Sequence, residues 1–386
     1  MQTSEVVSGG AMRRRHLTET LALGLVVILA VGACGSSASP SPTGTASTGP
    51  GSTGPASTGP SASTSANATK KTIAYLNADA VVSRWVFDEK GFKDEAAALG
   101  DDAVVVEAGG SVQTQTTQVE SMITKQVDAM VITPVDVGTA ASLFAKAASA
   151  NIPAINYNFI VPNIKPAYIV AQQAHLMGTT AATMALKAHP TGNYVIVSGD
   201  AAQSVAQDET SAYMEVLQPQ IDAGKITLVS QKFNAAWSPQ GAQAQVEAAL
   251  VKTNNKIDAV LSNNDGMAIA VMSALKPAGL LGKTFISGLD CDQPNLQAIA
   301  EGNQAVCMWT DFYEMGREAA QAADAAARGI TLTLPDLKDQ PNGSVTVPTV
   351  MMPVIAVTKD ILCSWLKQYQ WAPADKVYVN VTAPSC

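Results

Sequence analysis

The stretch TIAYLNADAVVSRWVFDEKGFKDEAAALGDDAVVVEA, residues 72–108, contains the pattern from which the fold can be predicted. It begins and ends with short apolar runs, TIAYLN (72–77) and AVVVEA (103–108), and residues 83–100 between them form a longer amphipathic segment. Short apolar runs bounded by polar or glycine residues are typical of buried strands, and the longer segment is typical of a helix. The stretch therefore predicts the strand–helix–strand unit of a parallel α/β sheet.

The same alternation continues along the chain. Residues 72–158 predict a βαβαβαβ half, and the cycle repeats from AYIVAQQ (167–173) to a final helix at 360–370. Within the first half we expect further strands at 129–134 and 153–158 and helices at 116–126 and 139–150. In the second we expect strands at 193–199, 226–233, 259–263, 284–290 and 305–310, helices at 175–189, 206–223, 239–253, 266–275, 295–302 and 312–329, and a late apolar stretch at 347–358. No long linker separates the two α/β units, so several short crossings are expected to join them.

The N-terminus is typical of an exported protein. Arg13, Arg14 and Arg15 precede the apolar run LALGLVVILAV (21–31), which is too short to span a bilayer as a helix. Val31-Gly32-Ala33-Cys34 then resembles a bacterial lipobox, so residues 1–33 are expected to be a lipoprotein signal peptide and Cys34 the lipid-attachment site. Ordinary signal cleavage with a free Cys34 is the alternative.

Residues 34–69 are expected to be a disordered linker. They consist almost entirely of Ser, Thr, Gly, Pro and Ala, and they carry neither charge nor hydrophobic periodicity. Such a segment would hold a folded domain away from a membrane.

Four cysteines remain beyond the linker, namely Cys291, Cys307, Cys363 and Cys386. An even number in an oxidising compartment permits two disulfides, and four cysteines allow three pairings. Proximity in the sequence favours Cys291–Cys307 and Cys363–Cys386.

Composition narrows the class of function. The 386-residue chain is 47% hydrophobic and has a formal net charge of −8, which argues against a nucleic-acid partner. No GxSxG, GxxxxGK[ST] or strand-linked GxGxxG motif is present. His175 and His189 lie at opposite ends of one predicted helix and do not form a metal pair. We therefore expect no metal, no cofactor and no catalytic residues.

Ligands of open parallel sheets bind beyond the carboxyl ends of the strands, so the residues at those positions are the candidates for binding. They are Asp79, Arg84, Trp85, Asn158, Phe159, Asp200, Gln203, Ser204, Trp237, Asn264, Asp265, Asp290, Asp292, Thr310 and Asp311. Carboxylates and amides pair with vicinal hydroxyls, and tryptophan faces cover the C–H side of a sugar ring. The set is suited to a neutral polyol.

Each candidate also has a purely structural interpretation. Trp237 precedes Ser238-Pro239, a helix N-cap followed by proline, and could simply pack at that helix entry. Asp265 and Asp292 could be helix caps, and Trp85 lies on a helix that must itself pack. The recurrence of such residues after strands in both halves favours binding.

Several stretches resemble the sugar-binding proteins of bacterial ABC importers, in the type I or ribose-binding group and most of all its xylose-binding members. They are NYVIVSGD, VLQPQIDAGKI, AAWSPQ, NNKIDAVLSNND, ISGLDCD and VPTVMMPVIAVTKD. The resemblance runs from about Thr72 to the final helix. It implies an α/β fold of two Rossmann-like lobes with parallel sheets, joined by three hinge crossings. The lobes would comprise residues 70–172 with about 311–350, and 173–310 with about 351–386.

The resemblance also implies site residues. Trp237 matches a stacking tryptophan, and Asn264 and Asp290 match hydroxyl-binding positions. Asp79, Arg84 and Trp85 match the start of the first-lobe site. Asn158-Phe159 departs from an Asp-Arg pair common in the family, and Thr310 departs from the lysine of xylose-type proteins. These departures leave the sugar open, with a larger glycoside or a deoxygenated sugar among the possibilities.

Together with the lipobox at Cys34, the resemblance implies a lipid-anchored, extracytoplasmic solute-binding protein, expected to be a monomer. It would capture a sugar or polyol and deliver it to the permease subunits of an ABC transporter. One alternative is a ligand sensor for a chemoreceptor or histidine kinase. Another is a surface glycan-acting enzyme using carboxylates among Asp79, Asp290 and Asp292, and a third is a soluble repressor. The absence of a helix-turn-helix in place of the signal and spacer argues against the repressor.

Overall fold

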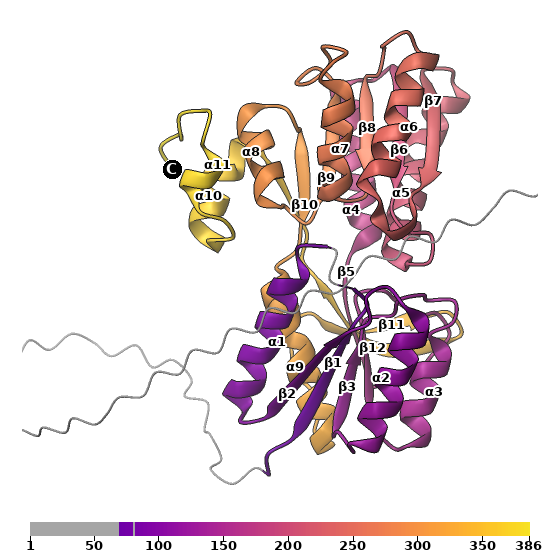
Figure 1. The fold of residues 1–386 in the computed structure, drawn as a ribbon, viewed down its shortest axis with the longest axis vertical. Helices are drawn as coiled ribbons and strands as arrows, with labels where there is room; N and C mark the ends of the chain where they lie inside the picture. The colour runs from indigo at the N-terminus through magenta and orange to yellow at the C-terminus, as the bar shows by residue number, and fades with distance from the viewer. Residues whose placement is uncertain (1–68, 80–81) are drawn as a thin grey trace, which may run out of the picture. The chain divides into compact units, whose positions relative to one another are not determined.

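Two mainly parallel β-sheets organise the part of the chain that the structure describes (Figure 1). The structure is a computed structural model that describes residues 69–79 and 82–386. The expected signal peptide, the lipid-attachment residue Cys34 and the linker up to residue 68 lie outside the described residues. Both sheets belong to one compact unit of the chain.

The first sheet has the strand order β11-β12-β5-β4-β3-β1-β2. Its strands are β1 (Thr72–Asn77), β2 (Asp102–Glu107), β3 (Ala129–Ile132), β4 (Ala154–Tyr157), β5 (Tyr168–Gln172), β11 (Leu337–Asn342) and β12 (Val345–Met352). One face is covered by α1 (Trp85–Leu99) and α9 (Phe312–Arg328), and the other by α2 (Val112–Thr124) and α3 (Ala141–Ser149). Because helices cover both faces, the central strands are continuous apolar runs.

The second sheet has the order β13-β10-β9-β8-β6-β7. Its strands are β6 (Gly192–Ser198), β7 (Ile226–Phe233), β8 (Ala259–Ser262), β9 (Phe285–Leu289), β10 (Val306–Trp309) and β13 (Ile355–Thr358). The helices of this part are α4 (Ala174–Ala188), α5 (Ser204–Asp222), the short 3-10 helix η1 (Ala235–Trp237), α6 (Pro239–Lys252), α7 (Asp265–Leu275), α8 (Gln293–Glu301), α10 (Lys359–Tyr369) and α11 (Ala374–Val377).

Within the described residues the chain passes between the two sheets three times, after β5, after β10 and after β12 (Figure 1). This is the expected type I architecture of two α/β halves joined by three crossings. The strand over 168–172, where the sequence pattern restarts, belongs to the first sheet rather than the second. Each sheet also has one antiparallel edge pair, β11 with β12 and β13 with β10, so the sheets are mixed rather than purely parallel.

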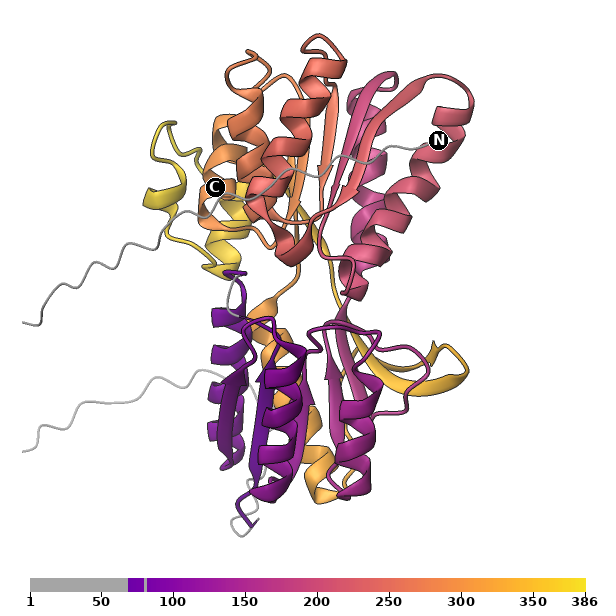
Figure 2. The same cartoon turned by 45° about the vertical axis from the view of Figure 1, so that its right-hand side comes forward.

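Two elements of the structure were not predicted from the sequence. The strand β11, LKDQPN, is polar and contains a proline, yet it pairs along its length with β12 to form a hairpin at the edge of the first sheet (Figure 2). Ladder pairing outweighs the low strand propensity of these residues. The short helix α11 lies in the C-terminal segment beyond the last predicted element.

Close packing of α1 against α9 sets the position of the start of α1. A Cβ at Gly91 would lie 2.0 Å from the carbonyl oxygen of Tyr313, and one at Gly316 would lie 2.0 Å from that of Asp88. The two glycines therefore let the helix backbones approach more closely than any larger residue would allow. This contact fixes the N-terminal turn of α1, which carries Arg84 and Trp85.

The structure pairs Cys291 with Cys307, and Cys363 with Cys386. This is the pairing that sequence proximity favours among the three. The first disulfide joins Cys291, just after β9, to Cys307 in β10, and the second ties the C-terminal tail to α10. Over residues 69–79 and 82–386, no helix is long and apolar enough to cross a membrane. No group of three or more His, Cys, Asp or Glu side chains in those ranges is placed to hold a metal ion.

Candidate functional site

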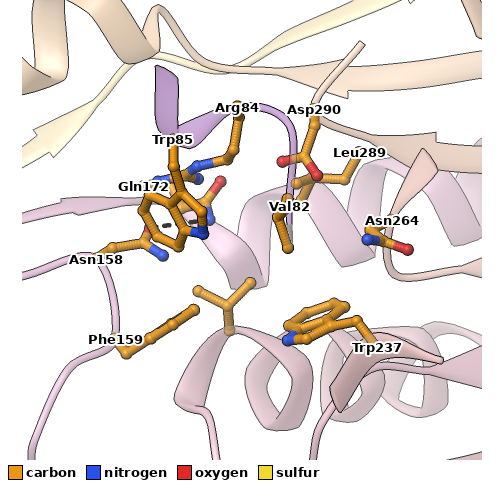
Figure 3. A pocket seen from close by; sticks show the side chains of 11 residues that line it. Val82, Arg84, Trp85, Asn158, Phe159, Gln172, Trp237, Asn264, Leu289 and Asp290 are labelled. Atoms are coloured by element: carbon orange, nitrogen blue, oxygen red, sulfur yellow. Dashed lines mark hydrogen bonds between the residues drawn. The ribbon is translucent and has the colours of Figure 1, made fainter. Parts of the chain in front are cut away.

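A cavity with about 280 Å³ of empty volume lies between residues of the first sheet's half and residues of the second's. Of the nine site residues that the resemblance implies, seven line it (Figure 3): Arg84, Trp85, Asn158, Phe159, Trp237, Asn264 and Asp290. Val82, Gln172, Val205 and Leu289 complete the wall.

Three of the lining residues have a backbone conformation that L-residues seldom adopt. Asn158 follows β4 with φ 58°, Asp290 follows β9 with φ 97°, and Trp237 ends η1 with φ 53°. Asn and Asp tolerate this left-handed region, whereas it is a genuine outlier for tryptophan. Such backbone strain clusters at functional sites, because the surrounding structure must hold it in place.

The loop before Trp237 is held by local hydrogen bonds. The Asp200 carboxylate accepts the N–H of Ala236 at 2.6 Å, and Ser238 caps α6 through the N–H of Gly241 at 3.1 Å. The indole N–H of Trp237 donates to Gln203 Oε1 at 2.6 Å. A Cβ at Gly199 would lie 2.2 Å from the Trp237 ring, so the absence of a side chain there makes room for the indole.

Arg84 is buried in a network that begins on α1. Its Nη2 donates to Asp88 Oδ1 at 3.0 Å, and the Tyr157 hydroxyl donates to the same oxygen at 2.6 Å. The guanidinium lies 4.3 Å from the centre of the Trp85 ring and 3.9 Å from that of Phe312, both within cation–π range. Ion pairing and stacking therefore fix Arg84 before any ligand arrives.

Three buried polar atoms in the cavity wall have no hydrogen-bond partner among the described residues: Arg84 Nε, Gln172 Oε1 and Asp290 Oδ1. One is a donor and the other two are acceptors when Asp290 is ionised. Burial raises the pKa of Asp290 well above its ordinary value, while the Arg84 guanidinium lowers it. Buried polar groups are almost always paired, so unpaired ones in a cavity wall are positions that a ligand can satisfy.

Asn264 combines a structural and a cavity-lining position. Its Oδ1 caps α7 by accepting the N–H of Met267 at 3.0 Å, and its amide nitrogen points toward the cavity (Figure 3). The neighbouring Asp265 is not the cap that the sequence suggested as an alternative. It is buried, and its carboxylate accepts the N–H of Asp292 at 2.9 Å.

The other two site residues that the resemblance implies, Asp79 and Thr310, do not line the cavity. Asp79 is buried and accepts the indole N–H of Trp85 at 3.2 Å, so it orients the Trp85 ring. Thr310 is fully buried at a crossing between the sheets, where its hydroxyl donates to the carbonyl of Pro353 at 3.2 Å. Its position after β10 was right, but its side chain faces the crossing rather than the cavity.

The carboxylates considered for a glycan-acting enzyme are not gathered in the cavity wall. Asp290 lines it, whereas Asp79 contacts Trp85 and Asp292 accepts a hydrogen bond from Ser83. Sequence reasoning missed Gln172, Val82, Val205 and Leu289. Gln172 ends β5, and its Nε2 donates to Asn158 Oδ1 at 3.0 Å, so its place at a strand's carboxyl end was a usable signal. The three apolar residues carry no such signal.

The Asp88 carboxyl gives a testable pH dependence. Burial raises the pKa of Asp88 to about 6, although the Arg84 guanidinium and the Tyr157 hydroxyl lower it. In the unfolded chain this carboxyl loses its proton near pH 4, so between about pH 4 and 6 the folded state binds the additional proton. Stability from this group is therefore fully present at low pH and is lost as the pH rises. We expect the stability of wild type relative to Asp88→Asn to fall by about 3 kcal/mol across this window.

Urea unfolding of both proteins at a series of pH values measures this difference. Tyr75, Tyr157 and Arg84 face Asp88 in both proteins, and Asp290 lies near enough to interact electrostatically, so comparing the two curves isolates residue 88. Parallel curves between pH 4 and 6 would contradict the expected titration of Asp88.

Comparison with known proteins agrees with this architecture. Residues 73–331 match the family model described as periplasmic binding protein domain. The chain is 29% identical over 298 residues to the D-xylose-binding periplasmic protein of Escherichia coli (strain K12), covering 77% of this chain and 90% of that protein. It is 28% identical to the protein of the same name from Haemophilus influenzae, over 77% of this chain and 89% of that protein.

A solved structure has the same fold. The ABC transporter solute-binding protein from Clostridium phytofermentans, with bound β-D-glucose, superposes with a TM-score of 0.71 at 22% identity, covering 80% of this chain and 100% of that one. These relatives are binding proteins rather than enzymes. The family match includes strands of both sheets, although it ends before β11, β12 and β13, and it includes every residue that lines the cavity. The chain belongs to the periplasmic binding protein family.

Proposed function

We propose that this protein is the solute-binding component of an ABC importer and that it captures a sugar or polyol in the cavity between its two halves. The observation that carries the proposal is the set of unpaired buried atoms, Arg84 Nε, Gln172 Oε1 and Asp290 Oδ1. Hydroxyl groups both donate and accept, so adjacent hydroxyls can satisfy a mixed set of donors and acceptors. The relatives named for D-xylose support a ligand of monosaccharide size.

Aromatic rings beside these polar atoms support the same ligand class. Trp85 and Phe159 meet edge to face with their ring centres 6.0 Å apart, and Trp237 contributes a third ring to the wall. Aromatic faces cover the C–H surfaces of sugar rings while polar groups bind the hydroxyls. We assign hydroxyl binding to Arg84, Asn158, Gln172, Asn264 and Asp290, and ring contact to Trp85, Phe159 and Trp237.

Binding would act through the relative movement of two lobes. We assign residues 70–172 and about 311–350 to one lobe, and 173–310 and about 351–386 to the other. A ligand that contacts Arg84 in one lobe and Asp290 in the other favours the conformation in which both contacts form. The permease would then recognise this ligand-bound shape of a monomeric binding protein.

A thermal-shift screen of the full chain in detergent tests the ligand class. Pentoses, hexoses, polyols, disaccharides and amino acids are added separately, because a ligand that binds only the native state raises the melting temperature. We expect a clear shift with at least one sugar or polyol and none with amino acids. A shift with amino acids alone would overturn the proposal. So would the absence of a shift with every compound of these classes.

We further propose that the protein is anchored outside the cytoplasm through lipidated Cys34. The support is the apolar run at 21–31, followed by small residues and the cysteine, and then by the uncharged segment to residue 69. A tether of this composition would keep the binding domain near the permease while leaving it free to reorient.

Replacing Cys34 with serine is expected to release the protein from membranes, because serine has no thiol to carry the lipid. The measurement is fractionation of cells expressing the full chain, followed by immunoblotting of membrane and soluble fractions. Ser36→Ala, two residues further along, is the matched control and should stay with the membrane. Persistence of the Cys34→Ser variant in the membrane fraction would rule out the anchor.

A further inference from the structure

The cavity has two chemically different sides. Arg84 and Asp290, with their unpaired buried atoms, lie on one side, whereas Phe159 and Trp237 face the cavity from the other (Figure 3). Val205, in the first turn of α5, also lines the cavity. We call Phe159, Val205 and Trp237 the apolar wall, and all three are almost fully buried.

Hydrogen bonds join Gln203 and Ser204, which precede Val205, to Trp237 and to Ile160, the residue after Phe159. Gln203 accepts the indole N–H of Trp237 at 2.6 Å, and the Ser204 hydroxyl accepts the N–H of Ile160 at 2.7 Å. Val205 is therefore placed between the loop that carries Phe159 and the turn that carries Trp237. The apolar wall is a built feature with fixed neighbours.

The polar groups of the apolar wall are already used within the protein. The indole N–H is the only polar side-chain group of Trp237, and it donates a hydrogen bond to Gln203. The carbonyl of Phe159 accepts the Asn156 amide at 2.9 Å, and its N–H donates to the Tyr157 carbonyl at 2.7 Å. Phe159 and Val205 have no polar side-chain atoms, so the apolar wall has no side-chain group left to bond a ligand hydroxyl.

A ligand hydroxyl turned toward this wall would lose its water without gaining a protein partner. An unsatisfied buried polar group weakens binding by about fivefold to 150-fold, the equivalent of about 1–3 kcal/mol. Replacing that hydroxyl with hydrogen removes the penalty and adds apolar contact. The wall therefore selects against a ligand with hydroxyls on every edge.

We propose that the ligand is a deoxy sugar, bound with its hydroxyl-bearing edge toward Arg84, Gln172 and Asp290 and its deoxygenated edge toward the apolar wall. This inference rests on the proposed function and narrows its ligand class. It uses the apolar ring of Phe159 and Val205, which both line the cavity.

Calorimetric titration of the full chain with matched sugars tests the proposal. The pairs are D-fucose against D-galactose, L-rhamnose against L-mannose, and 2-deoxy-D-ribose against D-ribose, because each pair differs by one hydroxyl. We expect the tightest-binding pair to favour its deoxy member by at least fivefold. Equal or tighter binding of the parent sugar in every pair that binds would overturn the deoxy preference and leave sugar binding intact. If no member of any pair binds, this inference is overturned. The proposed function still stands in that case if another sugar or polyol binds in the screen.

Val205→Thr provides an independent readout, because threonine has nearly the shape of valine and adds one hydroxyl to the wall. We expect this variant to reduce the preference for the deoxy member at least threefold, mainly through tighter binding of the parent sugar. Val205→Ala removes volume without adding a polar group, so this variant should still bind the deoxy sugar more tightly than the parent sugar. A Val205→Thr protein with the wild-type preference would show that residue 205 does not face the deoxygenated edge and would overturn the proposed orientation.

Discussion

Replacing Arg84 with glutamine is expected to lower ligand affinity about a hundredfold, the largest effect of any single change in the cavity. The guanidinium is the one cation in the described cavity wall, and its Nε is unpaired and buried. Hydrogen bonds from a charged donor contribute roughly twice as much as neutral ones, and glutamine provides only a neutral amide. Calorimetric titration with the ligand found in the screen measures the loss.

The same change also affects stability, so the two effects must be separated. Removing one partner of the buried Arg84–Asp88 pair leaves an uncompensated carboxylate, at a cost of about 3–5 kcal/mol. The double variant Arg84→Gln, Asp88→Asn removes both charges and should recover much of that stability without recovering affinity. Recovery of affinity together with stability would show that Arg84 supports the fold and does not contact the ligand.

Replacing Trp237 with alanine is expected to lower affinity at least tenfold while the fold is retained. The indole lines the cavity and its N–H is already bonded to Gln203, so its role toward a ligand is that of an apolar face. Burying a large aromatic surface contributes more than the 1.4 kcal/mol that corresponds to a tenfold change. Circular dichroism and titration of the same sample measure folding and affinity together.

Trp365→Ala is the matched control for that variant. Trp365 is also a buried tryptophan, but it packs against Trp309 and Tyr369 and does not line the cavity. It should lose comparable stability and keep its affinity. Unchanged affinity in Trp237→Ala would contradict ring contact with the ligand and would support the alternative interpretation, in which Trp237 only packs at the entry of α6.

The strands and helices could be predicted well because burial on both faces leaves an unambiguous pattern. Continuous apolar runs such as β1 and β3 are typical of sheets that helices cover on both faces, and the intervening helices are long enough to show their own periodicity. The hairpin strand β11 was not predicted, because its own residues are polar and include a proline, and its strand conformation depends on pairing with β12.

The candidate site could be predicted in part for a related reason. Positions after parallel strands converge on one edge, and that rule alone brings Asn158, Asn264 and Asp290 to the cavity. The rule gives position and not side-chain direction, which explains why Thr310 faces a crossing instead. Val205 was missed because an apolar residue in a first helical turn looks like any other core residue.

The left-handed backbone at Asn158 and Asp290 has a consequence for how this binding site can change over evolutionary time. Few residue types other than glycine, asparagine and aspartate tolerate those dihedral angles, so most single mutations there would damage folding before they could alter selectivity. Val205, in ordinary helical backbone, is free of that restriction. New ligand preferences should therefore arise among descendants of this protein mainly at helical and loop positions around a nearly constant pair of strand-end residues.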